Sequence, residues 1–204
     1  MAIVNGYCSL AELKTYTGIS GSGQDDNLEN AVETASREID KICNRIFYQT
    51  SSQDRYYTPI EKYQVLVDDI STTSGLVVKI DDNDDGSHNK TLTIDTDFYL
   101  TPVNVTDTNL QNQPYTCIKI LKDRSSERFD PRIVKQLKVT GAFGFSSLPD
   151  AIKQATLLQA TRLFKRKDSP FSVYGSDQTG NIELLNRFDP DAMKIIKGYI
   201  KRTL

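Results

Sequence analysis

One string of side chains in this sequence could bind a metal ion. Asp81-Asp82-Asn83-Asp84-Asp85-Gly86 places oxygen ligands at the first, third and fifth positions and glycine at the sixth, as in the first half of an EF-hand calcium loop. The twelfth position, which would need a bidentate glutamate, is Leu92, and the flanking residues have the pattern of strands. The string therefore predicts a hairpin turn, with a weak calcium site as the alternative.

Catalytic residues in a recognisable arrangement are missing from the rest of the sequence. His88 is the single histidine, no G-x-S-x-G turn accompanies it, and no cysteine lies close enough in sequence to complete a zinc site. Cys8, Cys43 and Cys117 are far apart, and neither a P-loop nor a G-x-G-x-x-G sequence occurs. We therefore expect a protein that is not an enzyme and uses no cofactor. We expect His88 to be solvated in a loop and the cysteines to be free thiols.

Basic side chains gather near the end of the chain. Lys165, Arg166 and Lys167 close one predicted helix, where they either offset the negative end of the helix dipole or form a basic rim facing phosphates or an acidic partner. The same two interpretations apply to the last predicted helix, which carries Lys194, Lys197, Lys201 and Arg202. The net charge of −2 argues against a protein that binds nucleic acid over its whole surface.

The middle of the chain has the pattern of antiparallel β structure. Short alternating segments are separated by turn-rich stretches without intervening helices, which predicts a sandwich or a barrel-like sheet. Four tyrosines in these segments are expected to pack on the sheet rather than to form a base-stacking platform: Tyr56, Tyr57, Tyr63 and Tyr99. The predicted strands are Arg55–Tyr57, Tyr63–Val67, Leu76–Ile80, Thr91–Ile94, Phe98–Leu100, Cys117–Leu121 and Ile133–Val139.

Helical patterns precede this β-rich part. Ser9-Leu10-Ala11-Glu12 is a capping box, which predicts a short helix that stops at Gly18. Asp25-Asp26 are N-cap candidates for a longer helix. Apolar residues at spacings of three and four, from Leu28 to Ile46, give that helix one buried face.

The chain returns from β structure to helix within a short stretch. Gly141 and Gly144 permit backbone angles that other residues resist, and we expect them to form the hinge between the two parts. Pro149 suits the first turn of the next helix, and a final helix begins near Asp189-Pro190. A loop of roughly twenty residues, Asp168 to Arg187, separates them, and a structureless loop of that length is usually functional or ordered only by a partner.

Composition fits a soluble protein, with 38% hydrophobic and 25% charged residues. No stretch approaches the length of an apolar membrane span, and the N-terminus lacks the pattern of a signal peptide. The cysteine spacing favours a reducing compartment.

The order and spacing of motifs in the two helical arms carry a further signal. The N-terminal arm contains Tyr7-x-Ser9-Leu10-x-Glu12-Leu13-Lys14, Asp25-Asp26 and Ala35-Ser36-Arg37-x-Ile39-Asp40-x-x-Cys43-Asn44-Arg45-x-Phe47-Tyr48. The C-terminal arm contains Val139-Thr140-Gly141-x-Phe143-Gly144, Leu148-Pro149, Arg162-Leu163-Phe164-Lys165-Arg166 and Asp189-Pro190 before a helix with Tyr199. Together these motifs resemble the head–tail connector (adaptor, head-completion) proteins of long-tailed bacteriophages, in a long form with a β-rich insert.

The resemblance implies a structural protein of the virion, made in the cytoplasm of the host bacterium. It implies a ring, commonly of twelve subunits, that docks beneath the portal at a capsid vertex. Such a ring extends the DNA channel, helps to retain the packaged genome and offers a docking platform for the stopper or tail. The implied partners are further copies of the chain, the portal protein, the stopper or tail-completion protein and double-stranded DNA in transit, with no membrane.

The residues expected to dock on the portal are Lys194, Lys197, Tyr199, Ile200, Lys201 and Arg202. Lys165, Arg166 and Lys167 are the expected basic rim facing the channel or the portal.

These observations predict an α+β protein with two parts. Residues 1–48 and 146–204 would form a helical connector core, and residues 49–145 an inserted antiparallel β domain. Shorter members of the family look like the helical part alone, so the resemblance does not assign a role to the insert. The alternative function is a tail-associated binding module whose insert recognises a carbohydrate or a host surface. A further alternative is a hydrolase that uses the Asp81–Asp85 carboxylates with a metal.

Overall fold

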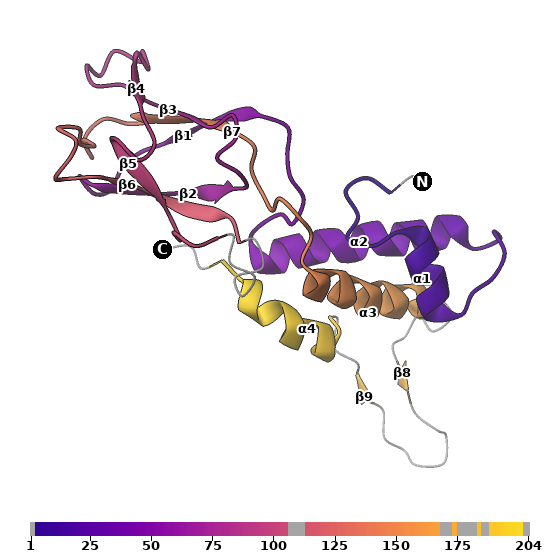
Figure 1. Ribbon diagram of the computed structural model, residues 1–204. Coiled ribbons are helices and arrows are strands. Elements are labelled where there is room, and N and C mark those ends of the chain that lie inside the picture. The colour runs from indigo at the N-terminus through magenta and orange to yellow at the C-terminus, as the bar shows by residue number, and fades with distance from the viewer. Residues whose placement is uncertain (1–2, 106–112, 168–172, 175–182, 185–187, 202–204) are drawn as a thin grey trace. The chain divides into compact units, whose positions relative to one another are not determined.

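The computed structural model of the chain describes residues 3–105, 113–167, 173–174, 183–184 and 188–201. The chain divides into two units, one of residues 1–47 with 148–204 and the other of residues 48–147. The boundaries predicted from the sequence differ from these by one or two residues. The first unit is built mainly of helices and the second of antiparallel strands, which is the α+β class that the sequence predicts (Figure 1). Among the described helices, none combines the length and the apolar character that crossing a bilayer would require.

The helical unit contains α1 (Leu10–Thr17), α2 (Asp25–Cys43), α3 (Asp150–Arg166) and α4 (Pro190–Ile196), and a 3₁₀ turn, η2 (Lys197–Tyr199), follows α4. α2 and α3 lie side by side, α1 contacts both of them, and α4 packs on α3 (Figure 1). Their shared core includes Leu13, Leu28, Val32, Ala35, Leu157 and Ala160. Because its alanines occupy little space, α2 and α3 can approach each other closely.

The short helix α1 begins and ends where the sequence predicts. The Ser9 hydroxyl accepts a hydrogen bond from the Glu12 N–H (3.2 Å), and the Glu12 carboxylate accepts one from the Ser9 N–H (2.8 Å). Gly18, with φ of 70°, ends the helix in the left-handed conformation. Lys153 of α3 donates to Glu12 over 2.9 Å. The hydrogen bonds from Ser9 and Lys153 lower the pKa of Glu12 to about 2.

This capping box gives the fold a testable acid sensitivity. Because the pKa of Glu12 is lower in the folded chain than its ordinary 4.5, the ionised carboxylate stabilises the fold above pH 4.5, and this contribution is lost as the pH falls towards about 2. The melting temperature of the wild type should therefore fall more steeply over this range than that of the Glu12→Gln variant. Ser9→Ala should cost about 1 kcal/mol of stability at neutral pH.

Thermal melts followed by circular dichroism from pH 6 to pH 2 test this expectation. Glu61→Gln removes an exposed carboxyl group of the other unit and serves as the control. Parallel acid profiles for the wild type and Glu12→Gln would contradict the role given to the capping box.

Three helix ends differ from the sequence expectation. Gln24 is the N-cap of α2, so Asp25-Asp26 lie in its first turn, where their charges still favour the positive end of the helix dipole. Asn44 adopts φ of 52° and ends α2, so Ile46 lies beyond the helix that was expected to include it. Pro149 is the N-cap of α3 rather than its first residue.

The predicted loop from Asp168 to Arg187 contains a short described pairing. β8 (Val173–Tyr174) and β9 (Glu183–Leu184) are antiparallel, which the prediction of a structureless loop missed. The rest of that loop lies outside the described residues.

Two antiparallel sheets form the β unit. One has the order β1 (Gln53–Tyr57), β7 (Leu137–Gly141), β3 (Val77–Ile80) and β4 (Lys90–Leu92), and the other has the order β2 (Gln64–Ile70), β6 (Tyr115–Ile120) and β5 (Phe98–Thr101). They form two layers (Figure 1). Side chains from both sheets share one core, including Val65, Ile70, Val78, Leu100, Ile118 and Val139. Of the two predicted β architectures, this arrangement is the sandwich.

The predicted hairpin turn at Asp81–Gly86 is confirmed and connects β3 to β4. The buried Asp81 carboxylate accepts hydrogen bonds from the N–H groups of Asn83 (3.2 Å), Asp85 (3.4 Å) and Gly86 (2.8 Å). Gly86 has φ of 80°, a conformation that glycine adopts readily. Asp81 therefore holds the turn together. Within the described ranges, no group of three or more side chains is arranged to hold a metal ion.

His88 and Tyr56 differ from their expected environments. His88 lies in a loop, as predicted, but it is half-buried, since its Nε2 lies 2.9 Å from the Lys135 carbonyl oxygen and its ring packs edge-on against Tyr56 at 5.3 Å. Tyr56 and Tyr63 were expected to pack on the sheet, yet they remain 47% and 39% exposed. Both tyrosines lie at the surface of the β unit, where the Tyr56 ring contacts His88 and the Tyr63 ring contacts the Lys122 ammonium.

The two glycines predicted to form a hinge have different backbone roles. Gly141 is the last residue of β7 and pairs with Gln53, and a Cβ there would lie 3.2 Å from Cδ1 of Leu76. Gly144 has φ of 98°, and its N–H donates to the Asp69 carbonyl over 2.7 Å. Close approach thus accounts for Gly141, and a left-handed backbone accounts for Gly144. Hinge motion at this pair stays a prediction.

Candidate docking surface

The start of α4 is fixed to the neighbouring helices by one buried glutamine. The Asp189 carboxylate caps α4 by accepting from the N–H groups of Asp191 (2.9 Å) and Ala192 (3.1 Å). The Asp189 N–H donates to Oε1 of Gln159, a buried residue of α3, over 2.9 Å. Nε2 of Gln159 donates to Glu38 of α2 over 2.7 Å. Gln159, on α3, therefore joins α2 to Asp189 at the start of α4.

The residues after α4 pack on the C-terminal end of α2. The Tyr199 ring lies edge-on to Phe47 with 5.7 Å between centres, and the Tyr199 carbonyl accepts from the Arg45 guanidinium over 3.3 Å. The Lys201 N–H donates to the Cys43 carbonyl over 2.8 Å. A helix leaves its last carbonyls without partners inside the helix, so the C-terminal segment satisfies one of these groups of α2.

Phe47 connects this segment to a buried polar cluster. Its ring is edge-on to Tyr7 at 5.7 Å, and its N–H donates to the Tyr7 hydroxyl over 2.8 Å. The Tyr7 hydroxyl donates to the Asp40 carboxylate, and the Arg37 guanidinium lies 3.2 Å from the same carboxylate. Burial raises the pKa of Tyr7 far above its ordinary value and also raises the pKa of Asp40. Tyr7 therefore stays a neutral donor that holds the aromatic stack on α2.

Three of the predicted docking residues are exposed: Lys194, Lys197 and Ile200. Lys194 lies on α4 and Lys197 in η2. No carboxylate of the described part of the chain forms an ion pair with either lysine. Two cations and an apolar side chain are thus free to meet a partner.

For the other predicted docking residues, docking stays a prediction. Tyr199 and Lys201 are half-buried and hold the C-terminal segment in place, and Arg202 lies outside the described residues. The basic residues were expected on one last helix. That expectation was wrong, because α4 ends at Ile196 and only Lys194 belongs to it.

The structure does not bring the predicted basic rim together with these residues. α4 runs antiparallel to α3, so Lys165 to Lys167, at the end of α3, lie at the opposite end of the helical unit from the residues after α4 (Figure 1). The Lys167 ammonium lies 5.0 Å from the centre of the Phe164 ring. Basic residues in this position also offset the negative end of the helix dipole.

Comparison with known proteins finds similarity in the fold. No family model matches the sequence, and no curated protein matches it. The fold resembles a chain in the solved structure of the neck of an empty GTA particle computed with C6 symmetry, with a TM-score of 0.53. The fold is shared along the whole chain. The similarity covers 100% of this chain and 95% of that one, at 13% sequence identity. The shared region therefore includes both the helical unit and the β unit.

The structural role of Gln159 was not predicted from the sequence. Its position was a usable signal, because it follows the buried Ala155 by four residues and so lies on the apolar face of α3. A polar side chain on such a face needs hydrogen-bond partners, and here α2 and the start of α4 supply them.

Proposed function

We propose that this protein is a structural subunit of the head–tail neck of a phage-like particle. The observation that supports the proposal best is the fold similarity, over the whole chain, to a chain from the neck of a GTA particle. The resemblance of both helical arms to phage connector proteins was found from different evidence, the order of sequence motifs. The proposed location is the virion.

Within the neck, we propose the role of the adaptor. Copies of the chain form a ring beneath the portal, extend the DNA channel, help to retain the genome and offer a platform to the stopper or tail. The GTA particle was computed with C6 symmetry, and sixfold symmetry is compatible with rings of six or of twelve copies. Twelve is the number that we propose. The role requires no catalysis.

The proposed portal-docking surface is the set of exposed residues at and after the end of α4, namely Lys194, Lys197 and Ile200. Unpaired lysines favour an acidic partner surface. The net charge of −2 agrees with a conduit, because a strongly basic channel would hold DNA and slow its passage.

Mass measurement and negative-stain images of the purified chain, with and without the portal protein of the same phage, test this proposal. We expect a ring of about a dozen copies that binds the portal. A monomer or trimer that binds glycans and ignores the portal would favour the tail-associated module. A chain that neither assembles nor binds the portal would contradict the adaptor role.

A further inference from the structure

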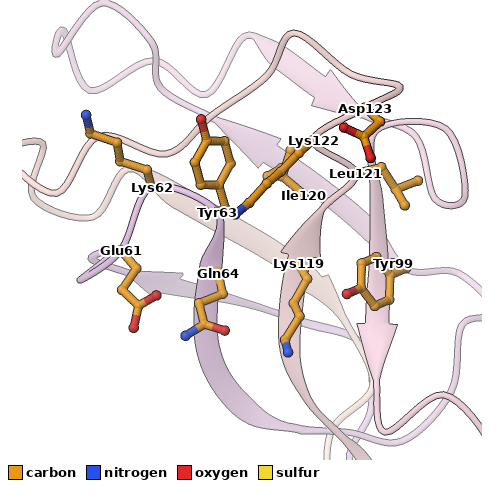
Figure 2. Close-up of a pocket in the computed structure, with 10 residues that line it drawn as sticks. All are labelled: Glu61, Lys62, Tyr63, Gln64, Tyr99, Lys119, Ile120, Leu121, Lys122 and Asp123. Atoms are coloured by element: carbon orange, nitrogen blue, oxygen red, sulfur yellow. The ribbon is translucent and has the colours of Figure 1, made fainter.

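An open pocket of about 440 Å³ lies on the three-stranded sheet of the β unit (Figure 2). The proposed function assigns no role to this pocket. Lys119 of β6 pairs with Gln64 of β2 on one side and with Tyr99 of β5 on the other. These residues alternate along their strands with buried residues, so they face away from the core. Figure 2 shows Lys119 between Gln64 and Tyr99.

The pocket carries an excess of positive charge. Lys62, Lys119 and Lys122 line it, against Glu61 and Asp123. None of the three lysines forms an ion pair within the described residues, and Lys62 has only a longer-range electrostatic interaction with Asp130.

Tyr63 adds an aromatic wall to this pocket. The Lys122 ammonium lies 4.3 Å from the centre of the Tyr63 ring, in a cation–π contact. Tyr63 is nevertheless 39% exposed. An exposed tyrosine beside lysines can receive an acidic protein segment, because tyrosines are enriched at interfaces and the lysines attract the opposite charge.

The other sheet of the same unit presents the complementary charge. At the β3–β4 turn, Asp82, Asp84 and Asp85 are exposed, while Asp81 is occupied in holding the turn. Asp82 has one weak partner, Lys90, at 3.8 Å, and Asp85 accepts from the Ser87 N–H over 2.7 Å.

The two surfaces do not meet within one chain. None of these aspartates lines the pocket, and the hairpin belongs to the four-stranded sheet, whereas the pocket belongs to the three-stranded sheet. The two complementary surfaces therefore lie on different layers of the sandwich.

We propose that the acidic hairpin, Asp82 to Asp85, of one copy docks into the lysine pocket, Lys62, Lys119 and Lys122, of the next copy. The two surfaces differ, so the contact is head-to-tail, and contacts of this kind close into a ring when the rotation between copies allows it. The inference rests on the proposed ring and gives the β unit a role in it, as the contact between neighbouring subunits.

Charge reversal on each side of the contact tests this inference. The pocket variant carries Lys119→Glu and Lys122→Glu, and the hairpin variant carries Asp84→Lys and Asp85→Lys. Each variant alone should assemble roughly tenfold to a hundredfold less readily than the wild type, by mass photometry over a dilution series. An equal mixture of the two variants should recover the ring, because the reversed pocket attracts the reversed hairpin. A chain that carries all four changes should recover it as well.

Two further variants separate charge from folding. Lys135→Glu reverses an exposed charge of the β unit outside the pocket and should assemble like the wild type. Asp84→Asn with Asp85→Asn keeps residues that tolerate the left-handed backbone of Asp84, with φ of 58°, and should weaken assembly less than full reversal does.

Each remaining outcome overturns the inference. If the wild type assembles and the pocket variant assembles equally well, the ring stands and this contact is wrong. If both variants fail and the mixture does not recover, the charges do not pair between copies. If the pocket variant assembles normally and loses only its binding to duplex DNA, the lysines bind nucleic acid instead of a neighbouring subunit. If the wild type forms no ring with or without the portal, the proposed function fails together with this contact.

Discussion

If the chain is a neck adaptor, particles whose copies of it end before Tyr199 are expected to be tailless or to leak their DNA, with infectivity reduced by orders of magnitude. The truncation removes the aromatic side chain of Tyr199, which packs on Phe47. It also removes the Lys201 N–H, which donates a hydrogen bond to the Cys43 carbonyl. The end of α2 then loses the residues that pack on it, which follow Lys194 and Lys197 in the chain. Plaque counts and electron micrographs of the particles measure the effect.

A second variant separates docking from folding. Lys194→Glu with Lys197→Glu reverses two exposed charges that have no described ion-pair partner and leaves the Tyr199 contacts in place. We expect this variant to melt like the wild type and to bind the portal roughly tenfold to a hundredfold more weakly. Normal infectious particles from the truncated chain, or unchanged portal binding by the charge-reversed chain, would show that this surface does not dock on the portal.

Replacement of Phe47 by alanine is expected to have the largest effect on stability. Phe47 is fully buried, it lies edge-on to both Tyr7 and Tyr199, and its loss leaves a cavity between α2 and the C-terminal segment. Phe→Ala changes in protein cores cost about 3–5 kcal/mol. That is a large part of the roughly 5–15 kcal/mol by which domains are stable.

Urea titrations followed by the helical circular dichroism signal measure this loss. Phe47→Leu keeps most of the apolar volume and should cost clearly less than Phe47→Ala. Tyr199→Ala should cost less in the Phe47→Ala background than in the wild type, since the shared ring contact is already absent. A cost below about 1 kcal/mol for Phe47→Ala would show that the aromatic stack does not hold the C-terminal segment.

Features that depend on neighbouring residues alone were predictable from the sequence. The capping box at Ser9 and Glu12 needs only four consecutive residues, and the turn at Asp81 closes on its own backbone N–H groups. The strands were found because alternation reports burial on one face, and both sheets bury one face against a shared core.

Features that depend on distant segments were not predictable. Nothing near Tyr199 in the sequence indicates that it packs on Phe47, or that Lys201 bonds the end of α2. These contacts join residues more than 150 positions apart, and they show that two predicted docking residues also hold the C-terminal segment on α2. The lysine pocket was missed for the same reason, because Lys62, Lys119 and Lys122 meet only after β2 and β6 pair.

Cryo-electron microscopy of intact particles, focused on the junction of head and tail, would show whether this chain forms the proposed ring. We expect a ring of copies of this chain beneath the portal, with Lys194 and Lys197 towards a neighbouring protein and a hairpin-to-pocket contact between copies. A neck that lacks this fold, or density for it only at the tail tip, would contradict the account.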